Sequence, residues 1–360
     1  MKILGVGGGT LGPVTPLLAT WKAIQRLHPE ATLVWIGTSD GPEQSLLSGR
    51  GVQVDTLPVV KWPRYPSLRW LTFPFDWLRA RRLAGELIDR HRPDVVMSVG
   101  GFTAVPVVYE ASKRGIPCVT HQLDVEPGLA NRHIASLCTR ITTSFEYEHP
   151  PFKHAPTDER IPTPTRFHLH NFPTPSAGRK IFHLDPKKRV VLIIGGGTGS
   201  QFLNEMVHRL LKTWLPFTQI LHSVGRGKAM YLPSDNTLPG YQGEILFEKN
   251  MAEAYAAADV VIARAGIGTL SEISALKKAT IIIPLPHSHQ EANAKAFEEQ
   301  GAALVMHQSH SSFDAQITKT LELLVTDTQL LHDLGERAHQ FFPTDDGTAF
   351  AQVVLGTLTS

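Results

Sequence analysis

The chain has 360 residues, of which 42% are hydrophobic and 19% are charged, and its formal net charge is +2. This length predicts two domains of roughly 150 to 200 residues each, and the composition is typical of a globular protein. The small net charge excludes a general attraction to nucleic acid, so we expect no nucleic-acid partner. The cysteines, Cys118 and Cys138, are too few for a disulfide framework, and we expect both to be reduced and buried in a cytosolic protein.

The N-terminal stretch reads MKILGVGGGT and turns to glycines after a few apolar residues, unlike a secretory signal peptide. No run in the sequence approaches the roughly 18 to 20 apolar residues that span a bilayer. Any membrane contact is therefore expected to be peripheral.

Short apolar runs alternate with longer segments of helical period, which predicts an α/β fold of βα units around parallel sheets. In the first half, strands are predicted at 1–7, 31–37, 94–100 and 117–123, with a helix over Pro16–Leu27. In the second half, they are predicted at 189–196, 218–225, 259–265 and 279–285, with a helix over Leu203–Trp214.

One pattern occurs twice. The order strand, glycine loop, helix appears in GVGGGTLGPVTPLLATWKAI from Gly5 and again in LIIGGGTGSQFLNEMVHRLL from Leu192, which predicts two Rossmann-like halves. The segment from Ile161 to Arg189 is rich in proline, basic residues and histidine, as is typical of a linker. The C-terminal FFPTDDGTAFAQVVLGTL has a proline break and then a helical period, so we expect it to pack back on the first half.

The opening loop, GGGTLGPVTP, is the first candidate site. A glycine turn before a helix presents free N–H groups to a phosphate, but a tight strand-to-helix turn has the same pattern. Neither glycine loop carries the Lys-Ser/Thr of a P-loop or the full dinucleotide pattern. Pro13 fits the start of a helix.

The stretch Ser98–Ser136 places His121, Gln122 and Asp124 at the carboxyl end of a predicted strand, where open α/β sheets bind ligands. His121 and Asp124 are candidates for a general base and its orienting partner. The alternative is a hydrogen-bonded histidine beneath the loop and a turn aspartate.

A third candidate reads RAGIGTLSEISAL, from Arg264. Thr269 and Glu272 are three residues apart, as in a capping box, and this local spacing favours the interpretation of Glu272 as a helix cap. The functional alternative is a helix N-terminus that faces a diphosphate, with Glu272 accepting hydrogen bonds from ribose hydroxyls. Downstream, His289, Gln290 and Asn293 begin a helix. His287 and His289 have no evident third ligand, so we expect no zinc site.

The fourth candidate, Lys61–Leu83, mixes aromatic residues with arginines. This composition predicts docking on an anionic membrane surface, with the contacts made by Trp62, Trp70, Phe73, Trp77 and Arg79. The alternative is a core-packing helix with a solvated basic edge, and nucleic acid fits less well.

Taken in order, these stretches resemble the MurG family of glycosyltransferases. The opening loop reads GGGTLGPVTPLLA where the family has GGTGGHVFPALA, and the stretch from Trp35 reads WIGTSDGPEQSLL where the family has WxGTxxxxExxLV. The next long motif reads DVVMSVGGFTAVPVVYEASKRGIPCVTHQLDVEPGLANR where the family has DVVxGxGGYxSxPxxxAAxxxGIPxxxHEQNxxPGLxNR. TPTR is similar to the family's NPVR, and IIGGGTGSQFLNE is similar to its VGGSQGAxxLNE. The family's donor-site motif resembles the stretch DVVIARAGIGTLSEISALKKATIIIPLPHSHQEANAKAFEEQGAA.

The resemblance implies a GT-B fold, with two Rossmann-like domains that face each other across a cleft. Residues 1–163 and a C-terminal helix at 343–360 would form the acceptor and membrane-docking domain, and residues 164–342 the UDP-sugar domain. The implied activity is inverting transfer of N-acetylglucosamine from UDP-GlcNAc to an undecaprenyl-diphosphate muramyl-peptide, which makes lipid II for peptidoglycan at the cytoplasmic face of the plasma membrane. UDP-GlcNAc would be the co-substrate, and no cofactor or metal is expected.

The resemblance also implies residue roles. The acceptor diphosphate would lie on Thr10, Leu11 and Gly12. In the donor site, Glu272 would hold the ribose, and the uracil would lie under LFEKNMAEAY with a backbone contact from Glu248. The remaining donor contacts would come from Arg166, Gly197, Ile267, Gly268, Thr269, Leu270, His289 and Gln290.

The sequence departs from the family where acceptor chemistry is expected. Pro13 replaces the histidine of GGTGGH, Gly197 replaces the serine of GGSQG, and Asp124 replaces the last residue of HEQN. Proline cannot accept a proton or donate an amide, so Asp124 and His121 are the candidate bases, with Asp40 third. The alternatives are a related transferase with another lipid acceptor, or a UDP-sugar-binding protein that has lost catalysis.

Overall fold

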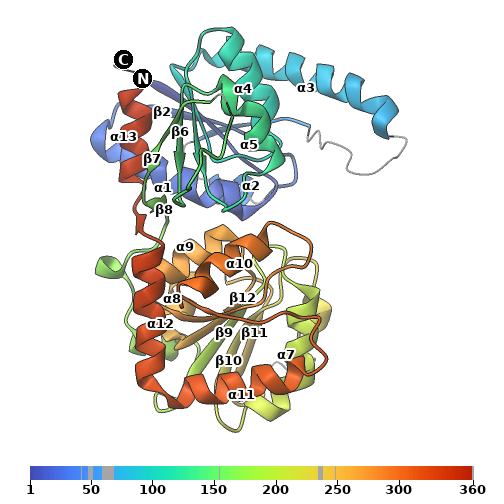
Figure 1. The fold of residues 1–360 in the computed structure, drawn as a ribbon, viewed down its shortest axis with the longest axis vertical. Helices are drawn as coiled ribbons and strands as arrows, with labels where there is room; N and C mark the ends of the chain where they lie inside the picture. Colours follow the sequence, from blue (N-terminus) through green and yellow to red (C-terminus); the bar gives the residue numbers. More distant parts are fainter. Residues whose placement is uncertain are drawn as a thin grey trace. The chain divides into compact units, whose positions relative to one another are not determined.

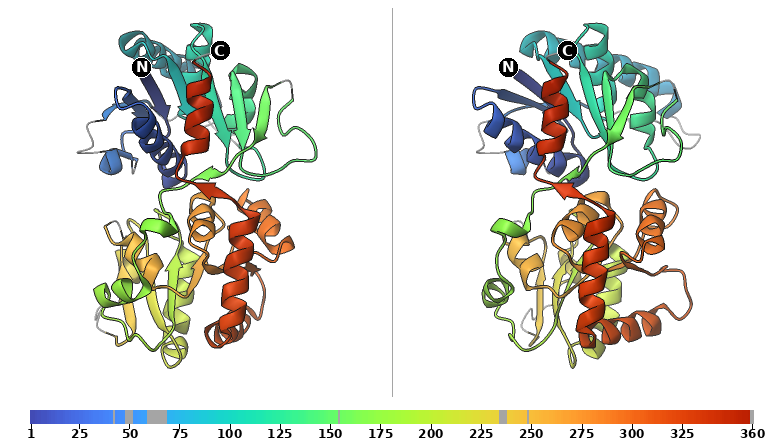
Figure 2. Two further views of the ribbon diagram at one scale, coloured as in Figure 1. Left: turned by 90° about the vertical axis from the view of Figure 1, so that its left-hand side faces the viewer. Right: turned by 60° about the vertical axis from the view of Figure 1, so that its left-hand side comes forward.

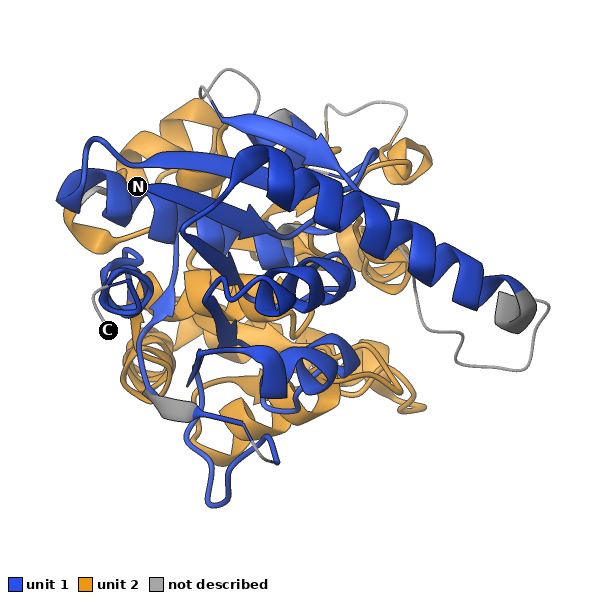
Figure 3. Ribbon diagram, turned by 90° about the horizontal axis from the view of Figure 1, so that it is seen from above, with its two compact units in different colours: residues 1–166, 345–360 blue, residues 167–344 orange. Residues whose placement is uncertain are grey.

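The computed structural model describes residues 1–41, 43–47, 52–58, 69–153, 155–233, 238–247 and 249–358. These residues divide into two compact units (Figure 3). Unit 1 comprises residues 1–166 and 345–360, and unit 2 comprises residues 167–344.

Unit 1 is built on a seven-stranded parallel sheet of order β3-β2-β1-β4-β5-β6-β7 (Figure 1). Its strands are β1 (Lys2–Val6), β2 (Thr32–Gly37), β3 (Gln53–Thr56), β4 (Val95–Ser98), β5 (Cys118–Gln122), β6 (Arg140–Thr143) and β7 (Thr157–Arg160). The helices are α1 (Leu11–Leu27), α2 (Glu43–Leu47), α3 (Arg69–His91), α4 (Ala104–Lys113), α5 (Leu129–Ile134), η1 (Ala135–Leu137) and α13 (Thr348–Gly356). A separate short pair joins β8 (Thr163–Pro164) to β15 (Thr344–Asp345).

Unit 2 repeats this plan with a six-stranded parallel sheet of order β11-β10-β9-β12-β13-β14. Its strands are β9 (Val190–Ile194), β10 (Gln219–Ser223), β11 (Tyr241–Glu244), β12 (Val260–Ala263), β13 (Ala279–Ile282) and β14 (Leu304–Val305). The helices are α6 (Pro175–Ile181), α7 (Gln201–Trp214), α8 (Met251–Ala257), α9 (Ile267–Ala275), α10 (Gln290–Glu299), α11 (Phe313–Thr326) and α12 (Thr328–Phe341), with short turns η2 (Leu169–Asn171) and η3 (Ala229–Tyr231).

Each core lies between the sheet and the helices that cover it. In unit 2 every residue of β9 is buried, and helix residues such as Leu203 and Met206 pack onto the strands. In unit 1 the equivalent layer joins β1, β2 and β4 to α3 and α4. Each such aliphatic side chain contributes about 1.5–3 kcal/mol when fully buried. The strands predicted from apolar runs are thereby confirmed, as β1, β2, β4, β5, β9, β10, β12 and β13.

The C-terminal helix α13 packs on α1 within unit 1, as Figure 2 shows. A Cβ at Gly347 would lie 2.4 Å from Thr20 N, so the backbones meet closely where α13 begins. Phe350 of α13 is fully buried. Helix α13 therefore contributes to the core of unit 1 together with α1.

Cys118 and Cys138 are both buried free thiols. Burial raises the pKa of both thiols, that of Cys138 to about 11. Among the described helices, none has the length and apolar character needed to cross a bilayer.

Candidate active site

The strand order of each sheet reverses at one place, between β1 and β4 in unit 1 and between β9 and β12 in unit 2. Ligands of open parallel sheets bind outside the carboxyl ends of the strands at such a point. In unit 1 the connections there are the glycine loops 7–10 and 99–103, and in unit 2 they are 195–200 and 264–266. The repeated glycine loop of the sequence thus lies at both switch points.

Arg264 is a buried cation at the unit 2 switch point. Its guanidinium donates to Ser200 Oγ at 3.0 Å, to the carbonyl oxygens of Ile283 and Pro284 at 2.9 and 2.8 Å, and to Gln308 Oε1 at 2.9 Å. No carboxylate pairs with it in the described part of the chain, and burial lowers its pKa to about 10. The residue therefore ties the ends of several strands together and leaves a positive charge at this edge.

Helix α9 begins earlier than the capping-box interpretation requires. Its N-cap is Gly266, and the Thr269 amide donates to Gly266 O at 2.9 Å. Thr269 is thus the third helical residue rather than the cap, and the capping box is wrong. The amides of Ile267 and Gly268 precede the first intrahelical hydrogen bond and are the ones a helix presents to an anion. Glu272 lies one turn further and is only 6% exposed.

Helix α10 is joined to the start of α9 by Asn293, which is fully buried and donates to Ala265 O at 3.1 Å. His289 is the exposed N-cap of α10. Gln290 Oε1 accepts from Leu285 N at 3.1 Å. The structure therefore brings His289 and Gln290 to the edge where α9 begins.

The other predicted donor residues are Gly197, Arg166 and Glu248. Gly197 is half-buried in the loop between β9 and α7, and Arg166 ends unit 1. Glu248 lies outside the described residues. Its neighbours Phe247 and Lys249 line a pocket of about 460 Å³, together with Phe182, Arg226, Glu244, Ile245, Leu246 and Asn250.

In unit 1 the opening loop leads into the N-terminus of α1, which has no side-chain cap. Gly9 has φ +81°, and α1 starts at Leu11 with Thr10 as its extended N-cap. The amides of Leu11 and Gly12 are therefore those of the first turn, and Pro13 occupies its third position, where a missing N–H costs no hydrogen bond. A Cβ at Gly101 would lie 3.7 Å from Pro13 Cγ, so the second glycine loop of unit 1 lies close to the first turn of α1.

His121 is fully buried in β5. Its Nδ1 hydrogen-bonds Thr142 Oγ1 at 2.8 Å and its Nε2 hydrogen-bonds Ser144 Oγ at 2.9 Å. Burial lowers its pKa to about 3, so it is a neutral imidazole. Direct proton transfer by His121 does not fit this geometry, which instead matches the alternative of a hydrogen-bonded core histidine.

Asp124 follows β5 and is half-exposed. Its carbonyl oxygen accepts from Gln122 Nε2 at 2.7 Å and from Tyr147 OH at 3.0 Å, and Asn131 Nδ2 holds Gln122 in place at 2.6 Å. Burial, and then the charge of Asp124, raise the pKa of the Tyr147 phenol. Asp40, the third candidate base, is exposed after β2. Asp124 is thus the candidate base whose backbone is fixed at the carboxyl edge of the sheet.

The aromatic-basic segment is described only from α3 onward. Trp62 lies outside the described residues, and only the backbone of Trp70 is described. Phe73 and Trp77 are half-buried, with Trp77 packed edge-on against Tyr109 at 6.2 Å, while Arg79 is exposed. The most exposed apolar side chains here are Phe75 at 74% and Leu78 at 58%. Figures 1 and 3 show this end of α3 reaching past the rest of unit 1.

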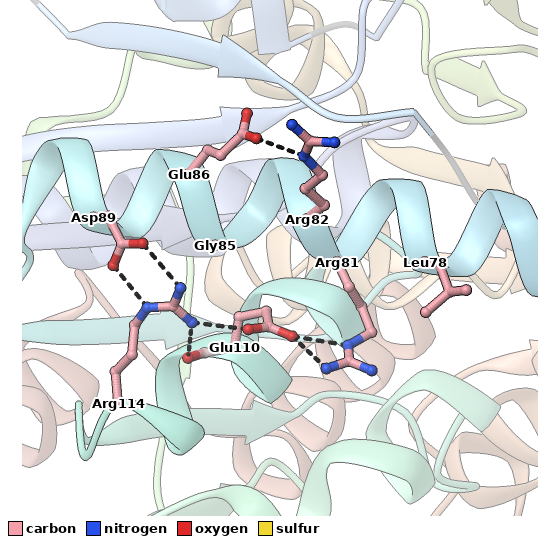
Figure 4. A pocket seen from close by; sticks show the side chains of 8 residues that line it. All are labelled: Leu78, Arg81, Arg82, Gly85, Glu86, Asp89, Glu110 and Arg114. Carbon is pink, nitrogen blue, oxygen red and sulfur yellow. Dashed lines mark hydrogen bonds and ion pairs between the residues drawn. The ribbon is translucent and has the colours of Figure 1, made fainter.

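Further along, α3 is joined to α4 across a groove of about 370 Å³ (Figure 4). Arg81 and Arg114 both pair with Glu110, at 2.7 and 2.8 Å, and Arg114 also pairs with Asp89 at 2.8 Å. Although burial opposes it, these hydrogen bonds lower the pKa of Glu110. Because the guanidinium groups of Arg81 and Arg114 are already paired, we assign these side chains the structural role of joining α3 to α4.

Within the described ranges, no three histidine, cysteine, aspartate or glutamate side chains gather as a metal site. Sequence reasoning gave no role to Arg264, Asn131 or Glu43, which are all buried polar residues at the carboxyl edges. For Arg264 the available signal was its place directly after an apolar strand. Glu43 and Asn131 were within the quoted WIGTSDGPEQSLL and PGLANR motifs.

Two solved glycosyltransferase structures share this architecture. The chain resembles MurG of Acinetobacter baumannii with a TM-score of 0.72 at 24% identity, covering 99% of both chains. It resembles the Streptomyces glycosyltransferase SsfS6, solved with thymidine diphosphate, with a TM-score of 0.63 at 15% identity, again covering 99% of both. The fold is therefore the GT-B class, with two Rossmann-like units.

The family follows from sequence. Residues 3–143 match the glycosyltransferase family 28 N-terminal domain and residues 190–344 its C-terminal domain. A Nocardioides relative is 33% identical over 99% of this chain and 98% of its own length, and a Clostridioides difficile relative is 32% identical over 93% and 84%. Both are named UDP-N-acetylglucosamine–N-acetylmuramyl-(pentapeptide) pyrophosphoryl-undecaprenol N-acetylglucosamine transferase. The chain belongs to glycosyltransferase family 28 and is a hexosyltransferase, which confirms the resemblance.

Proposed function

We propose that this enzyme transfers N-acetylglucosamine from UDP-GlcNAc to a muramyl-peptide on undecaprenyl diphosphate, with inversion at the anomeric carbon, and so makes lipid II. The names of the relatives support the substrates. The observation that carries the donor class is the N-terminus of α9, where Gly266 begins the helix and Glu272 lies buried one turn inside.

On the donor side, the amides of Ile267 and Gly268 bind the diphosphate, and Glu272 accepts from the ribose hydroxyls. His289 and Gln290 contact the sugar, and the pocket beside Phe247 takes the uracil. The charge of Arg264 and the dipole of α9 stabilise the leaving diphosphate, so no metal ion is needed.

On the acceptor side, the amides of Leu11 and Gly12, with Thr10, bind the lipid-linked diphosphate. Asp124 removes the proton from the acceptor hydroxyl as UDP leaves. Its half-exposed position and fixed backbone support this role.

The projecting end of α3 docks the enzyme on the cytoplasmic leaflet. Phe75 and Leu78 supply exposed apolar surface, and Arg79 supplies positive charge. Behind this end, ion pairs of Arg81 with Glu110 and of Arg114 with Asp89 join α3 to α4.

Replacing Glu272 with alanine is expected to weaken UDP-GlcNAc binding by about 1–3 kcal/mol, because the ribose hydroxyls lose a charged acceptor. Titration calorimetry measures this change. The matched control is Glu291→Ala, which removes an exposed carboxylate from the first turn of α10 and should leave the affinity within about twofold. Unchanged donor affinity with lowered stability would assign Glu272 a structural role only.

The double substitution of Phe75 and Leu78 by serine is expected to reduce binding to anionic vesicles at least tenfold, since each side chain contributes roughly 1.5–3 kcal/mol when buried. Arg79→Ala should add a smaller, salt-dependent loss of about 1 kcal/mol. Flotation with phosphatidylglycerol vesicles is the measurement. Met230→Ser, which removes a side chain 76% exposed in unit 2, is the control. Unaltered flotation of the double variant would refute the docking surface.

A transfer assay with UDP-GlcNAc and a panel of lipid-linked acceptors tests the function itself. Turnover with the muramyl-peptide lipid, a β-linked product and activity retained in EDTA are expected. Pro13 at the start of α1 and the burial of His121 favour a different lipid diphosphate as the second candidate acceptor, which the same panel would reveal. Donor binding without transfer to any acceptor would contradict both candidates.

A further inference from the structure

Glu43 is a fully buried carboxylate beneath the opening loop of unit 1. Its Oε1 accepts from Thr38 N at 2.6 Å and from Thr38 Oγ1 at 2.7 Å, and its Oε2 accepts from Gly9 N at 3.2 Å. In the part of the chain that the structure describes, no lysine, arginine or histidine pairs with it. A buried carboxyl group is costly unless its oxygens accept hydrogen bonds, and both oxygens of Glu43 do so.

The backbone around Glu43 is shaped to admit the carboxylate. A Cβ at Gly41 would lie 2.0 Å from its Oε2, and a Cβ at Gly8 would lie 2.3 Å from its Oε1. Gly37 is also close, since a Cβ there would lie 2.8 Å from Glu43 Cγ. Any larger residue at these positions would displace the side chain. The carboxylate therefore bridges the end of β2 and the loop after β1 at a position the backbone leaves open for it.

The contact with Gly9 determines which amides remain available at the start of α1. Gly9 has φ +81°, a left-handed conformation that the hydrogen bond to Glu43 holds in place. The next residue, Thr10, is the N-cap, and the first helical amides belong to Leu11 and Gly12. Glu43 thus occupies the Gly9 amide and fixes the direction in which the following amides point.

We propose that Glu43 is a positioning residue for the acceptor, which orients the amides of Leu11 and Gly12 toward the lipid-linked diphosphate. This inference rests on the proposed function of the opening loop. Glu43 does not contact the substrate. It holds the backbone that does.

The test replaces Glu43 with glutamine, whose NH₂ group cannot accept from Gly9. The KM for the lipid-linked acceptor should rise at least tenfold while the KM for UDP-GlcNAc stays within twofold. Hydrogen exchange of the amides in residues 7–12 should accelerate at least tenfold. If this variant does not fold, Glu43→Asp keeps the charge, shortens the side chain by one methylene and should show the same acceptor-selective change.

The matched control is Thr38→Val, which removes one hydrogen bond to the same carboxylate on the side away from Gly9. It should leave both KM values within twofold and the exchange of residues 7–12 unchanged. The proposal is overturned if Glu43→Gln alters both KM values equally, or neither, or leaves exchange in the loop unchanged. If the unmodified enzyme transfers no sugar to a lipid diphosphate, the proposed function fails, but the exchange comparison still decides whether Glu43 holds the loop.

Discussion

Asp124→Asn is expected to lower kcat by roughly 100- to 10,000-fold, the usual contribution of a general base. Asparagine has the same shape, so the hydrogen bonds from Gln122 and Tyr147 to the backbone carbonyl are retained. The side chain loses its negative charge and with it the ability to accept a proton from the acceptor hydroxyl. Single-turnover transfer with saturating UDP-GlcNAc measures the chemical step.

Glu126→Gln is the control, because Glu126 is an exposed carboxylate two residues further along the same turn. It should leave kcat within about threefold. Donor affinity should be unchanged in both variants. Full turnover by Asp124→Asn would exclude Asp124 as the base and direct attention to Asp40.

Arg264→Met is expected to lower the free energy of unfolding of unit 2 by about 3–5 kcal/mol and to weaken donor binding roughly tenfold. The substitution leaves the acceptors on Ser200, Ile283, Pro284 and Gln308 without their donor. It also removes a positive charge from the edge where the donor diphosphate binds. Urea denaturation followed by hydrogen exchange in β9 and β12, with calorimetry for the donor, measures both effects.

Arg209→Met is the control within the same unit. Arg209 makes an ion pair with Asp314 at 2.8 Å, but both side chains are more than 40% exposed, at 45% and 42%. Exposed pairs contribute less than about 1 kcal/mol, so a small change is expected. Equal losses of unfolding free energy from the two substitutions would mean that buried Arg264 stabilises unit 2 no more than an exposed arginine does.

The central strands were predictable because they are covered on both faces and therefore read as continuous apolar runs, as in VVLII of β9. Strands β3, β6 and β11 were missed. Their sequences QVDT, RITT and YQGE carry too little apolar character, and they are recognisable as strands only because neighbours supply the pairing.

The start of α9 shows what local spacing cannot decide. Thr269 and Glu272 have the separation of a capping box, yet the helix begins at Ile267 after a connection of only Arg264 to Gly266. Asn293, on another helix, holds Ala265 and so fixes that connection. The residue at which α9 begins therefore depends on a contact between residues that are distant in sequence.

The α/β class, the two glycine loops at equivalent places and the family could be predicted from the sequence, because these features depend on patterns within short segments. Which polar residues are buried could be seen only in the folded chain. His121 lost access to solvent because Thr142, Ser144 and Phe350 surround it, and Glu43 gained its place because distant glycines meet around it. Burial depends on which segments pack together, and that information is spread over residues far apart in the chain.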